Sequence, residues 1–219
     1  MNSPAVSEEF CNNDSEVKNN ALFTEERIDL TAIYQDFVSL CIWQPSRNKQ
    51  LEQYAYELAL GKFEFKQLVT IDSVSASLDL LPNGEGKAEM KEWIADLVET
   101  FATLFGLEQV GLRIAGRETP MCPSFHVDHV PTRLIHPLCG EGCEWFADPL
   151  YFKADIPDET HLKSWVKEAQ NSQREKINQA PVGSVVIMKG TRWDKGCYPV
   201  IHRSPKHDQP RLVMTLDFA

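Results

Sequence analysis

Two histidines and one aspartate in the second half of the chain have the residue types of a metal site. His126 and Asp128 stand two residues apart in the segment SFHVDHV. Side chains two apart on a strand point the same way, so this pair would chelate an ion while His129 faces the other side. A late strand that carries His202 would supply a third ligand if it neighbours the first strand across a barrel. Two histidines and one carboxylate leave the opposite positions of the ion open, which suits non-haem Fe(II) that must accept O₂ and a co-substrate.

An arginine follows the last of these residues at a short distance. Arg211 lies nine residues after His202, across a turn expected between Pro205 and Pro210. A hairpin at this turn would bring both side chains to the same mouth of a barrel. Because a guanidinium binds a carboxylate through two parallel hydrogen bonds, Arg211 is the candidate residue for holding the carboxylate of a co-substrate.

Two cysteines close to the same segment offer a different metal chemistry. Cys139 and Cys143 are separated by three residues, and His129 and His136 precede them in the sequence. Zinc takes cysteine and histidine ligands in tetrahedral geometry, although this cysteine spacing is looser than that of most structural zinc sites. The alternative hypothesis is therefore a zinc-binding or metal-handling protein that uses the same pocket without oxygen chemistry.

The elements that must position these side chains are short strands. After Gly106 the sequence consists of apolar runs broken by glycine and proline, as is typical of strands. These runs are VGLRIAG, SFHVDHV, TRLIHPL, CEWFA, GSVVIMKG, YPVIHRS and PRLVMTLDF. Between the fourth and the fifth lies a polar amphipathic stretch, residues 157–179, which we predict to be a helical insertion.

Helices are expected before these strands. Apolar residues at i, i+3, i+4 and i+7 predict a long helix over residues 87–106, and a second helix is predicted over 47–60. Residues 24–42 indicate a short helix running into a strand, and the polar residues 1–20 a flexible tail. We therefore expect one α+β domain over 21–219, in which 21–107 is helical support and 108–219 forms a small barrel or sandwich.

The composition excludes several classes of protein. In the 219 residues, 42% are hydrophobic and 25% charged, which is typical of a folded globular protein. Lysine and arginine number 22 against 32 acidic residues, and the net charge of −10 disfavours binding to nucleic acid. No apolar run has the length of a membrane span, and the acidic N-terminus lacks the features of a secretory signal. We expect a cytoplasmic protein without a membrane partner; the sequence does not indicate an oligomeric state.

The ordered set of motifs resembles the Fe(II)/2-oxoglutarate-dependent dioxygenase superfamily over roughly residues 108–219. The H-x-D motif of that superfamily corresponds to His126 and Asp128, its distal metal histidine to His202, and its co-substrate arginine to Arg211. The run from residue 133 to residue 145 resembles the segment R-L-x-x-L-x-G-x-G-T-x-W, and PVGSVVIMKG (181–190) resembles the strand that precedes the distal histidine. The full chain also resembles an uncharacterised bacterial domain-of-unknown-function family.

This resemblance implies a double-stranded β-helix, a jelly-roll or cupin-like barrel, backed by the N-terminal helices. It implies Fe(II) on the three ligands, 2-oxoglutarate with its far carboxylate at Arg211, and oxidation of a small molecule or a protein side chain. The insertion at 157–179 would lie near the mouth of the barrel as a substrate lid. The chain departs from the pattern at Val213, where many members have a co-substrate-binding serine, and at Cys143, where threonine is usual. The valine also leaves open a cupin-like binding module without activity.

The remaining candidate residues are expected to have structural roles. Arg133 is expected to pair with an acidic neighbour, and Trp145 and Met188 to belong to the core. The histidines outside the proposed Fe(II) ligands are expected to be exposed or capping residues: His129, His136, His161 and His207. No phosphate-binding loop, dinucleotide fingerprint or nucleophile elbow appears, so kinase, Rossmann and hydrolase functions are not favoured.

Overall fold

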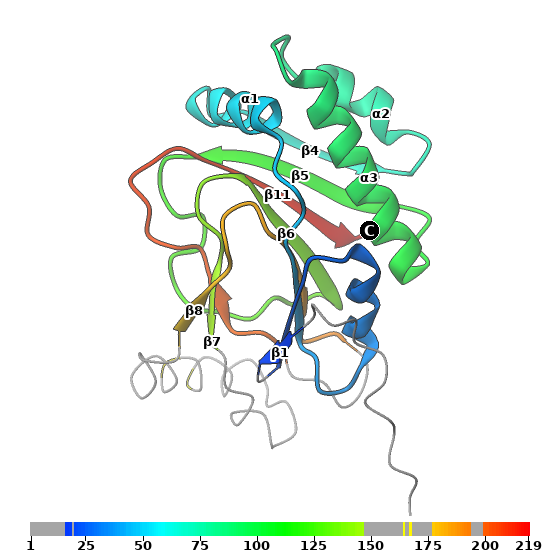
Figure 1. The fold of residues 1–219 in the computed structure, drawn as a ribbon, viewed down its shortest axis with the longest axis vertical. Coiled ribbons are helices and arrows are strands. Elements are labelled where there is room, and N and C mark those ends of the chain that lie inside the picture. The colour runs from blue at the N-terminus through cyan, green and yellow to red at the C-terminus, as the bar shows by residue number, and fades with distance from the viewer. Residues whose placement is uncertain (1–15, 19, 147–163, 165–166, 168–176, 194–198) are drawn as a thin grey trace, which may run out of the picture.

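The computed structural model contains two sheets, and helices cover one face of the larger sheet (Figure 1). It describes residues 16–18, 20–146, 164, 167, 177–193 and 199–219. The strands are β1 (Glu16–Lys18), β2 (Ala21–Thr24), β3 (Leu40–Trp43), β4 (Glu64–Val69), β5 (Val110–Arg117), β6 (Thr132–Cys139), β7 (Glu144–Phe146), β8 (Ile177–Gln179), β9 (Val185–Lys189), β10 (His202–Arg203) and β11 (Arg211–Phe218). The helices are η1 (Arg27–Tyr34), α1 (Lys49–Leu60), α2 (Val74–Ser77), η2 (Leu78–Leu80) and α3 (Lys87–Phe105).

From β5 onward the chain passes back and forth between the two sheets. The larger sheet has the order β1-β2-β3-β9-β6-β11-β5-β4, and the smaller sheet has the order β10-β7-β8. An isolated antiparallel bridge between His126 and His202 adds one more segment beside β10. Every strand pairing from β5 onward is antiparallel within the described residues. Two antiparallel sheets connected in this way form a jelly roll, so the predicted double-stranded β-helix is confirmed.

Each face of the larger sheet has its own apolar core, because successive side chains on a strand point to opposite sides. On β11, Leu212, Met214 and Leu216 belong to the cluster on the helical face. Val213 belongs to a second cluster that also contains Trp145 of the smaller sheet. The interior of the barrel is thus separated from the helical layer by the sheet itself.

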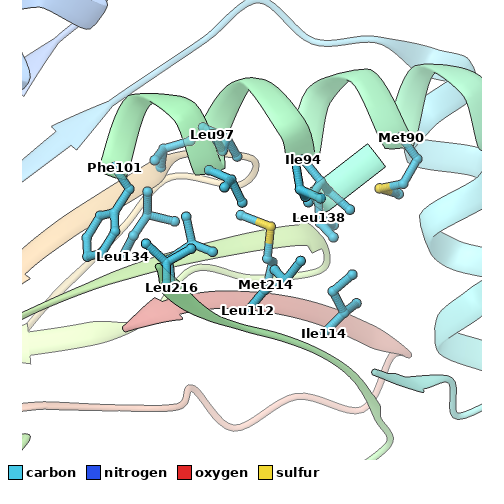
Figure 2. Packing of buried hydrophobic residues seen from close by; sticks show 14 of the residues in the cluster. Met90, Ile94, Leu97, Phe101, Leu112, Ile114, Leu134, Leu138, Met214 and Leu216 are labelled. Carbon is cyan, nitrogen blue, oxygen red and sulfur yellow. The ribbon is translucent and has the colours of Figure 1, made fainter. Parts of the chain in front are cut away.

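The long helix α3 packs along the outer face of the larger sheet. Figure 2 shows Met90, Ile94, Leu97 and Phe101 of α3 pointing toward apolar side chains of β5, β6 and β11, and all four are fully buried. The helix ends at Gly106, which adopts a positive φ of 63° that favours glycine. The observed bounds therefore confirm the helix predicted over 87–106 to within one residue.

The second predicted helix is also present, as α1. Asn48 caps its start, since the side-chain Oδ1 accepts hydrogen bonds from the backbone N–H of Gln50 at 3.0 Å and of Leu51 at 3.2 Å. The predicted short helix before a strand corresponds to η1 and β3. Both helical predictions rested on apolar spacing that packs one side of the helix against the sheet.

Three parts of the predicted organisation differ from the structure. Residues 21–107 are not helical support alone, because β2, β3 and β4 extend the larger sheet at both edges. The expected tail contains β1, which pairs with β2, while 1–15 and 19 lie outside the described residues. The predicted insertion at 157–179 also lies outside the described residues except at 164, 167 and 177–179, and its last three residues form β8. Except for β4, which has six residues, these strands have three or four residues and are too short for a period-2 pattern to identify them.

No helix in the described part of the chain has the length and apolar character needed to span a bilayer.

The packing of α3 predicts a large loss of stability on truncation of its core side chains. Phe101 is fully buried and its ring lies 4.9 Å from that of Phe105 and 5.9 Å from that of Phe218. We expect Phe101→Ala to lower the free energy of unfolding by about 3–5 kcal/mol, measured by urea denaturation. Leu80→Ala is the control, because Leu80 is 66% exposed, and it should change stability by less than about 0.5 kcal/mol. Equal losses in the two variants would contradict this packing.

Candidate metal centre

Three side chains from distant parts of the chain converge at one end of the barrel interior. The prediction of a strand over SFHVDHV was wrong: His126 and Asp128 lie in the loop between β5 and β6, where only His126 forms an isolated bridge. His202 lies on β10. One donor atom from each lies within 4.8 Å of the others. Nε2 of His126 is 3.5 Å from Oδ1 of Asp128, and Nε2 of His202 is 3.4 Å from Oδ2. No other group of three or more histidine, cysteine, aspartate or glutamate side chains converges in this way among the described residues.

The backbone holds the two histidines side by side. The N–H of His126 donates to the carbonyl of His202 at 3.0 Å, and the N–H of His202 donates back at 2.9 Å. Residues directly opposite each other on antiparallel chains place their side chains on the same face, and the two ring centroids are 4.5 Å apart. On the other side of β10, Trp145 of β7 is the partner of His202.

The loop that carries Asp128 is fixed by the segment after β9. The carbonyl oxygen of Asp128 accepts a hydrogen bond from Thr191 N at 2.9 Å, and the carbonyl oxygen of Val130 accepts one from Arg192 N at 3.1 Å. A Cβ at Gly190 would lie 2.7 Å from the first carbonyl oxygen and 2.2 Å from the second. Only glycine leaves room for this approach, so the glycine predicted to end the GSVVIMKG strand serves to position the candidate aspartate ligand.

The hydrogen bonds of the histidines leave their Nε2 atoms free toward Asp128. Nδ1 of His126 lies 3.0 Å from the carbonyl oxygen of Ser124, and Nδ1 of His202 lies 3.1 Å from that of Val200. A carbonyl only accepts, so each Nδ1 carries the proton and each Nε2 of a neutral ring is an acceptor. Two such acceptors and a carboxylate face one another, and Asp128 Oδ2 is buried without a hydrogen bond of regular geometry. A cation between them satisfies all three groups, and these residues therefore fit a metal ion.

Burial and neighbouring charges set the ionisation of the three groups. Burial lowers the pKa of His202 to about 4, so this imidazole is neutral at neutral pH. Burial would raise the pKa of Asp128, but contact with His126 and the charges of His202 and Arg133 outweigh it and lower the pKa to about 2. Contact with the same carboxylate raises the pKa of His126. A proton and a metal ion would therefore compete for His126, while Asp128 and His202 are ready to bind the metal.

Arg211 lies inside the barrel, at the start of β11. The residue is 3% exposed, and it shares the inner face of the sheet with Val213. Its Nε donates to the carbonyl oxygen of Glu141 at 2.7 Å, and no carboxylate among the described residues forms an ion pair with it. Gly140, with a φ of 86°, makes room for it, because a Cβ there would lie 2.9 Å from Arg211 Cγ. Arg211 is therefore a buried residue of the larger sheet, and its contact with a co-substrate stays a prediction.

Cys143 is a buried thiol in the apolar cluster on the inner side of the larger sheet. Burial raises the pKa of its thiol to about 11, while the charges of Arg211 and of Asp128 act on it in opposite directions. Because burial disfavours the thiolate, the sulfur of Cys143 is protonated at neutral pH in this structure.

The alternative set of zinc ligands is not brought together. His136 lies on the helical face of β6, where its Nε2 accepts a hydrogen bond from Trp93 Nε1 at 3.0 Å. Cys139 contacts the carbonyl oxygen of Pro210 at 3.8 Å, and exposed His129 contacts the hydroxyl of Thr191 at 2.9 Å. Strand alternation directs His136 to the helical side of the larger sheet, whereas Cys143 belongs to the apolar cluster on its inner side.

The residues expected to have structural roles are placed as follows. Trp145 and Met188 are buried, as predicted. Arg133 pairs with Asp217, also as predicted: Nε donates to Oδ1 at 2.6 Å and Nη2 to Oδ2 at 2.9 Å. The prediction that His136 is an exposed or capping residue was wrong, because it is 4% exposed and lies within β6. His161 lies outside the described residues.

A large open cleft is separate from the three converging side chains. It has a volume of about 960 Å³ and lies on the helical side, lined by α1, α3, β3 and β6. Trp43, Trp93 and His136 are among its lining residues, and His126, Asp128 and His202 are not.

The buried histidine on the helical face predicts a pH dependence of stability. Burial lowers the pKa of His136 to about 4, against 6.5 for an exposed histidine. As the pH falls below about 6.5, the unfolded chain binds a proton that the folded chain does not bind until about pH 4, so folding is progressively disfavoured. His136→Gln has no group at this position that binds a proton, so its stability should not show this loss. The free energy of unfolding of wild type relative to the variant should therefore fall by about 3 kcal/mol between pH 7 and pH 4. Chemical denaturation at both pH values measures this; a constant difference would contradict it.

Comparison with solved structures finds several oxygenases among the matches. Rice dioxygenase for auxin oxidation is 14% identical with a TM-score of 0.47, over 81% of this chain and 72% of that chain. The Kdo hydroxylase KdoO, a non-haem Fe(II) dioxygenase, is 13% identical with a TM-score of 0.42, over 91% and 89%. A prolyl-4-hydroxylase of Pseudomonas putida is 10% identical with a TM-score of 0.40, over 88% and 97%. At such identities and scores, the function of this chain must be inferred from its own side chains.

No curated protein matches the sequence. One protein family, described as "Protein of unknown function (DUF1826)", matches residues 24–217. This range includes nearly the whole barrel from β5 to β11, all three converging side chains and Arg211. The chain therefore belongs to the DUF1826 family.

Proposed function

We propose that this protein is a non-haem Fe(II) and 2-oxoglutarate-dependent oxygenase. The observation that carries the proposal is the convergence of His126, Asp128 and His202 with their acceptor atoms facing one another. Two neutral imidazoles and one carboxylate on one side of an ion form the set that non-haem Fe(II) oxygenases use. The double-stranded β-helix around the three residues is consistent with this function but does not by itself imply it.

The chain's own residues would hold the metal and keep water away from it. His126 and His202 would bind through Nε2, because their Nδ1 atoms already contact backbone carbonyls. Asp128 would bind as a carboxylate, since its pKa of about 2 keeps it ionised. When bound, Fe(II) would supply the reaction with O₂ that no side chain can perform. Trp145, Val213 and other apolar side chains of the interior would exclude water from its surroundings.

Arg211 supports 2-oxoglutarate as the co-substrate. A buried guanidinium without a carboxylate partner is costly, and an acidic ligand inside the barrel would remove that cost. The hydrogen bond from Nε to Glu141 leaves the two terminal nitrogens of the guanidinium to bind the far carboxylate of the co-substrate. Val213, in place of the usual serine, makes the arginine the main anchor for this carboxylate.

We also propose a small molecule or a protein side chain as the substrate. The net charge of −10 supports this class over nucleic acid, whose phosphates require a basic surface. The zinc alternative has less support, since Cys139 and Cys143 do not join the histidines in one group among the described residues.

Metal and co-substrate binding test the proposal directly. Anaerobic addition of Fe(II) and 2-oxoglutarate together should produce a visible charge-transfer absorption that neither produces alone. We expect His202→Ala to abolish this band, because two remaining ligands cannot hold the ion, and His129→Ala, in the same region but outside the three ligands, to retain it. Stoichiometric zinc that survives His202→Ala but is lost in Cys143→Ser would contradict the proposal.

The role of Arg211 is tested separately from metal binding. We expect Arg211→Met to weaken 2-oxoglutarate binding at least about 100-fold, because a charge-assisted bidentate contact is lost. Fe(II) binding without co-substrate should be unchanged, since Arg211 is not one of the three ligands. Calorimetric titration of each ligand measures both effects. If 2-oxoglutarate bound the variant as tightly as wild type, Arg211 would not be the co-substrate residue.

A further inference from the structure

The open cleft on the helical side of the molecule has two tryptophans among its lining residues. The ring centroids of Trp43 and Trp93 are 5.7 Å apart, with 48° between the ring planes. Nε1 of Trp93 donates to Nε2 of His136 at 3.0 Å, and Nε1 of Trp43 donates to the carbonyl oxygen of Glu25 at 3.0 Å. A hydrogen bond thus holds each indole, and both aromatic rings are in place before a ligand binds.

The cleft also has an excess of negative charge. Six of its lining residues are acidic and two are basic. The two basic residues are paired within the cleft, Arg27 with Asp96 and Arg47 with Glu52. The other four carboxylates form no ion pair among the described residues, and they belong to Glu25, Glu26, Glu89 and Glu92. A cleft lined by one sign of charge concentrates ligands of the opposite sign.

One of the two tryptophans already holds a cation of the chain itself. Cζ of Arg27 lies 5.8 Å from the centroid of the Trp43 ring, and Nη1 of the same guanidinium lies 2.5 Å from Oδ1 of Asp96. The face of an indole and a carboxylate are the two kinds of contact that hold a guanidinium or ammonium group. This part of the cleft therefore shows how the lining residues bind a cation.

The other tryptophan has the same kinds of neighbour without a cation. Glu89 lies one helical turn before Trp93 on α3, Glu92 directly precedes it, and all three line the cleft. Trp93 is partly exposed, whereas Trp43 is 7% exposed. None of the lysine or arginine side chains that the structure describes lies over the ring of Trp93. An external cation would find an aromatic face and two unpaired carboxylates here.

We propose that this cleft binds a basic peptide segment of another protein, with a lysine or arginine side chain against Trp93, Glu89 and Glu92. Glu25 and Glu26 stand just before η1, away from α3 in the sequence, so a second cation of the same segment would meet them. The inference does not depend on the proposed function, because His126, Asp128 and His202 do not line the cleft.

The size and the polar lining of the cleft favour a peptide over a small cation. Its volume of about 960 Å³ is at the upper end of the range for small-molecule sites. The side chains of Gln44 and Ser46 are exposed and also line the cleft, where they offer hydrogen bonds to peptide groups. A single small amine has no peptide groups and would meet only one of the two pairs of carboxylates.

Titration calorimetry with a capped peptide of four arginines tests this inference without measuring activity. The control ligand is the same peptide with citrulline in place of every arginine, since it keeps the shape and lacks the charge. We expect the arginine peptide to bind at least about 10-fold more tightly, because the contacts with the indole and the carboxylates require a cation. Equal affinities of the two peptides, or no binding of either, would overturn the inference.

A pair of double variants separates this cleft from the charge of the whole protein. Glu89→Gln/Glu92→Gln should weaken binding of the arginine peptide at least about 5-fold. The matched control is Glu99→Gln/Glu108→Gln, which changes the charge equally at two exposed residues outside the cleft and should change affinity less than about 2-fold. If both double variants lost affinity equally, the peptide would respond to net charge alone, and the inference would be overturned.

Two substitutions of Trp93 test the contact with its ring. Both remove the hydrogen bond to His136, but only Trp93→Phe keeps an aromatic face. We expect Trp93→Leu to weaken binding of the arginine peptide at least about 5-fold and Trp93→Phe to retain affinity within about 3-fold. If the two variants bound the peptide equally, the ring would have no role and the inference would be overturned. The variants of Glu89 and Glu92 keep the test valid if Trp93→Leu does not fold.

Spermidine is the probe for the other class of occupant, because it has several cations and no peptide groups. We expect it to bind at least about 10-fold more weakly than the arginine peptide. If spermidine bound as tightly and lost affinity equally in Glu89→Gln/Glu92→Gln, the cleft would be a site for small amines, and its assignment to a peptide would be overturned.

Discussion

A carboxylate held between two imidazoles is the arrangement on which the rest of the barrel interior depends. Asp128 faces Nε2 of both His126 and His202, and neither nitrogen carries a proton when the ring is neutral. Acceptor atoms do not gather in this way without a proton or a cation between them. The protein nevertheless brings them together through a pair of backbone hydrogen bonds and the guanidinium of Arg133. Folding therefore supplies the orientation that a metal ion requires before the ion binds.

The two faces of the larger sheet carry different kinds of side chain: one face packs against the helices, and the other carries charged groups near the candidate site. Its outer face, with Met214 and Leu216, packs against α3 (Figure 2). Its inner face carries Val213 and, by strand alternation, Arg211 and Asp217. Both sets of side chains alternate along the same strand, β11. Apolar packing on one face can thus hold charged groups at fixed positions on the other.

The two ends of β11 serve different parts of the candidate site. Arg211 at its start is held by the carbonyl of Glu141, and Asp217 near its end holds Arg133. β11 pairs with β5 in one continuous register from Arg211 to Phe218, and its pairing with β6 shifts in register between Leu212 and Val213. The continuous pairing with β5 fixes the spacing of Arg211 and Asp217. The proposed co-substrate contact and the orientation of the metal ligand therefore depend on one rigid element.

Local periodicity made the long helix and the main strands predictable from the sequence, whereas the jelly-roll architecture was implied by the resemblance of the motifs to a known superfamily. The apolar spacing in α3 and the runs that became β5, β6, β9 and β11 are each determined by residues close to one another in the chain. The strands β1, β2, β4 and β8 were not recognised, since their pairing depends on partners elsewhere in the fold.

The sequence by itself determined the types and order of the candidate ligands and of Arg211. Only the tertiary structure decided which other side chains lie next to the candidate ligands. His136 belongs to the helical face because of its position on β6, whereas Arg133 reaches Asp128 because β11 places Asp217 opposite it. The physical reason is that a spacing in sequence fixes the face of a strand, but contacts between residues far apart in the chain exist only once the strands have paired.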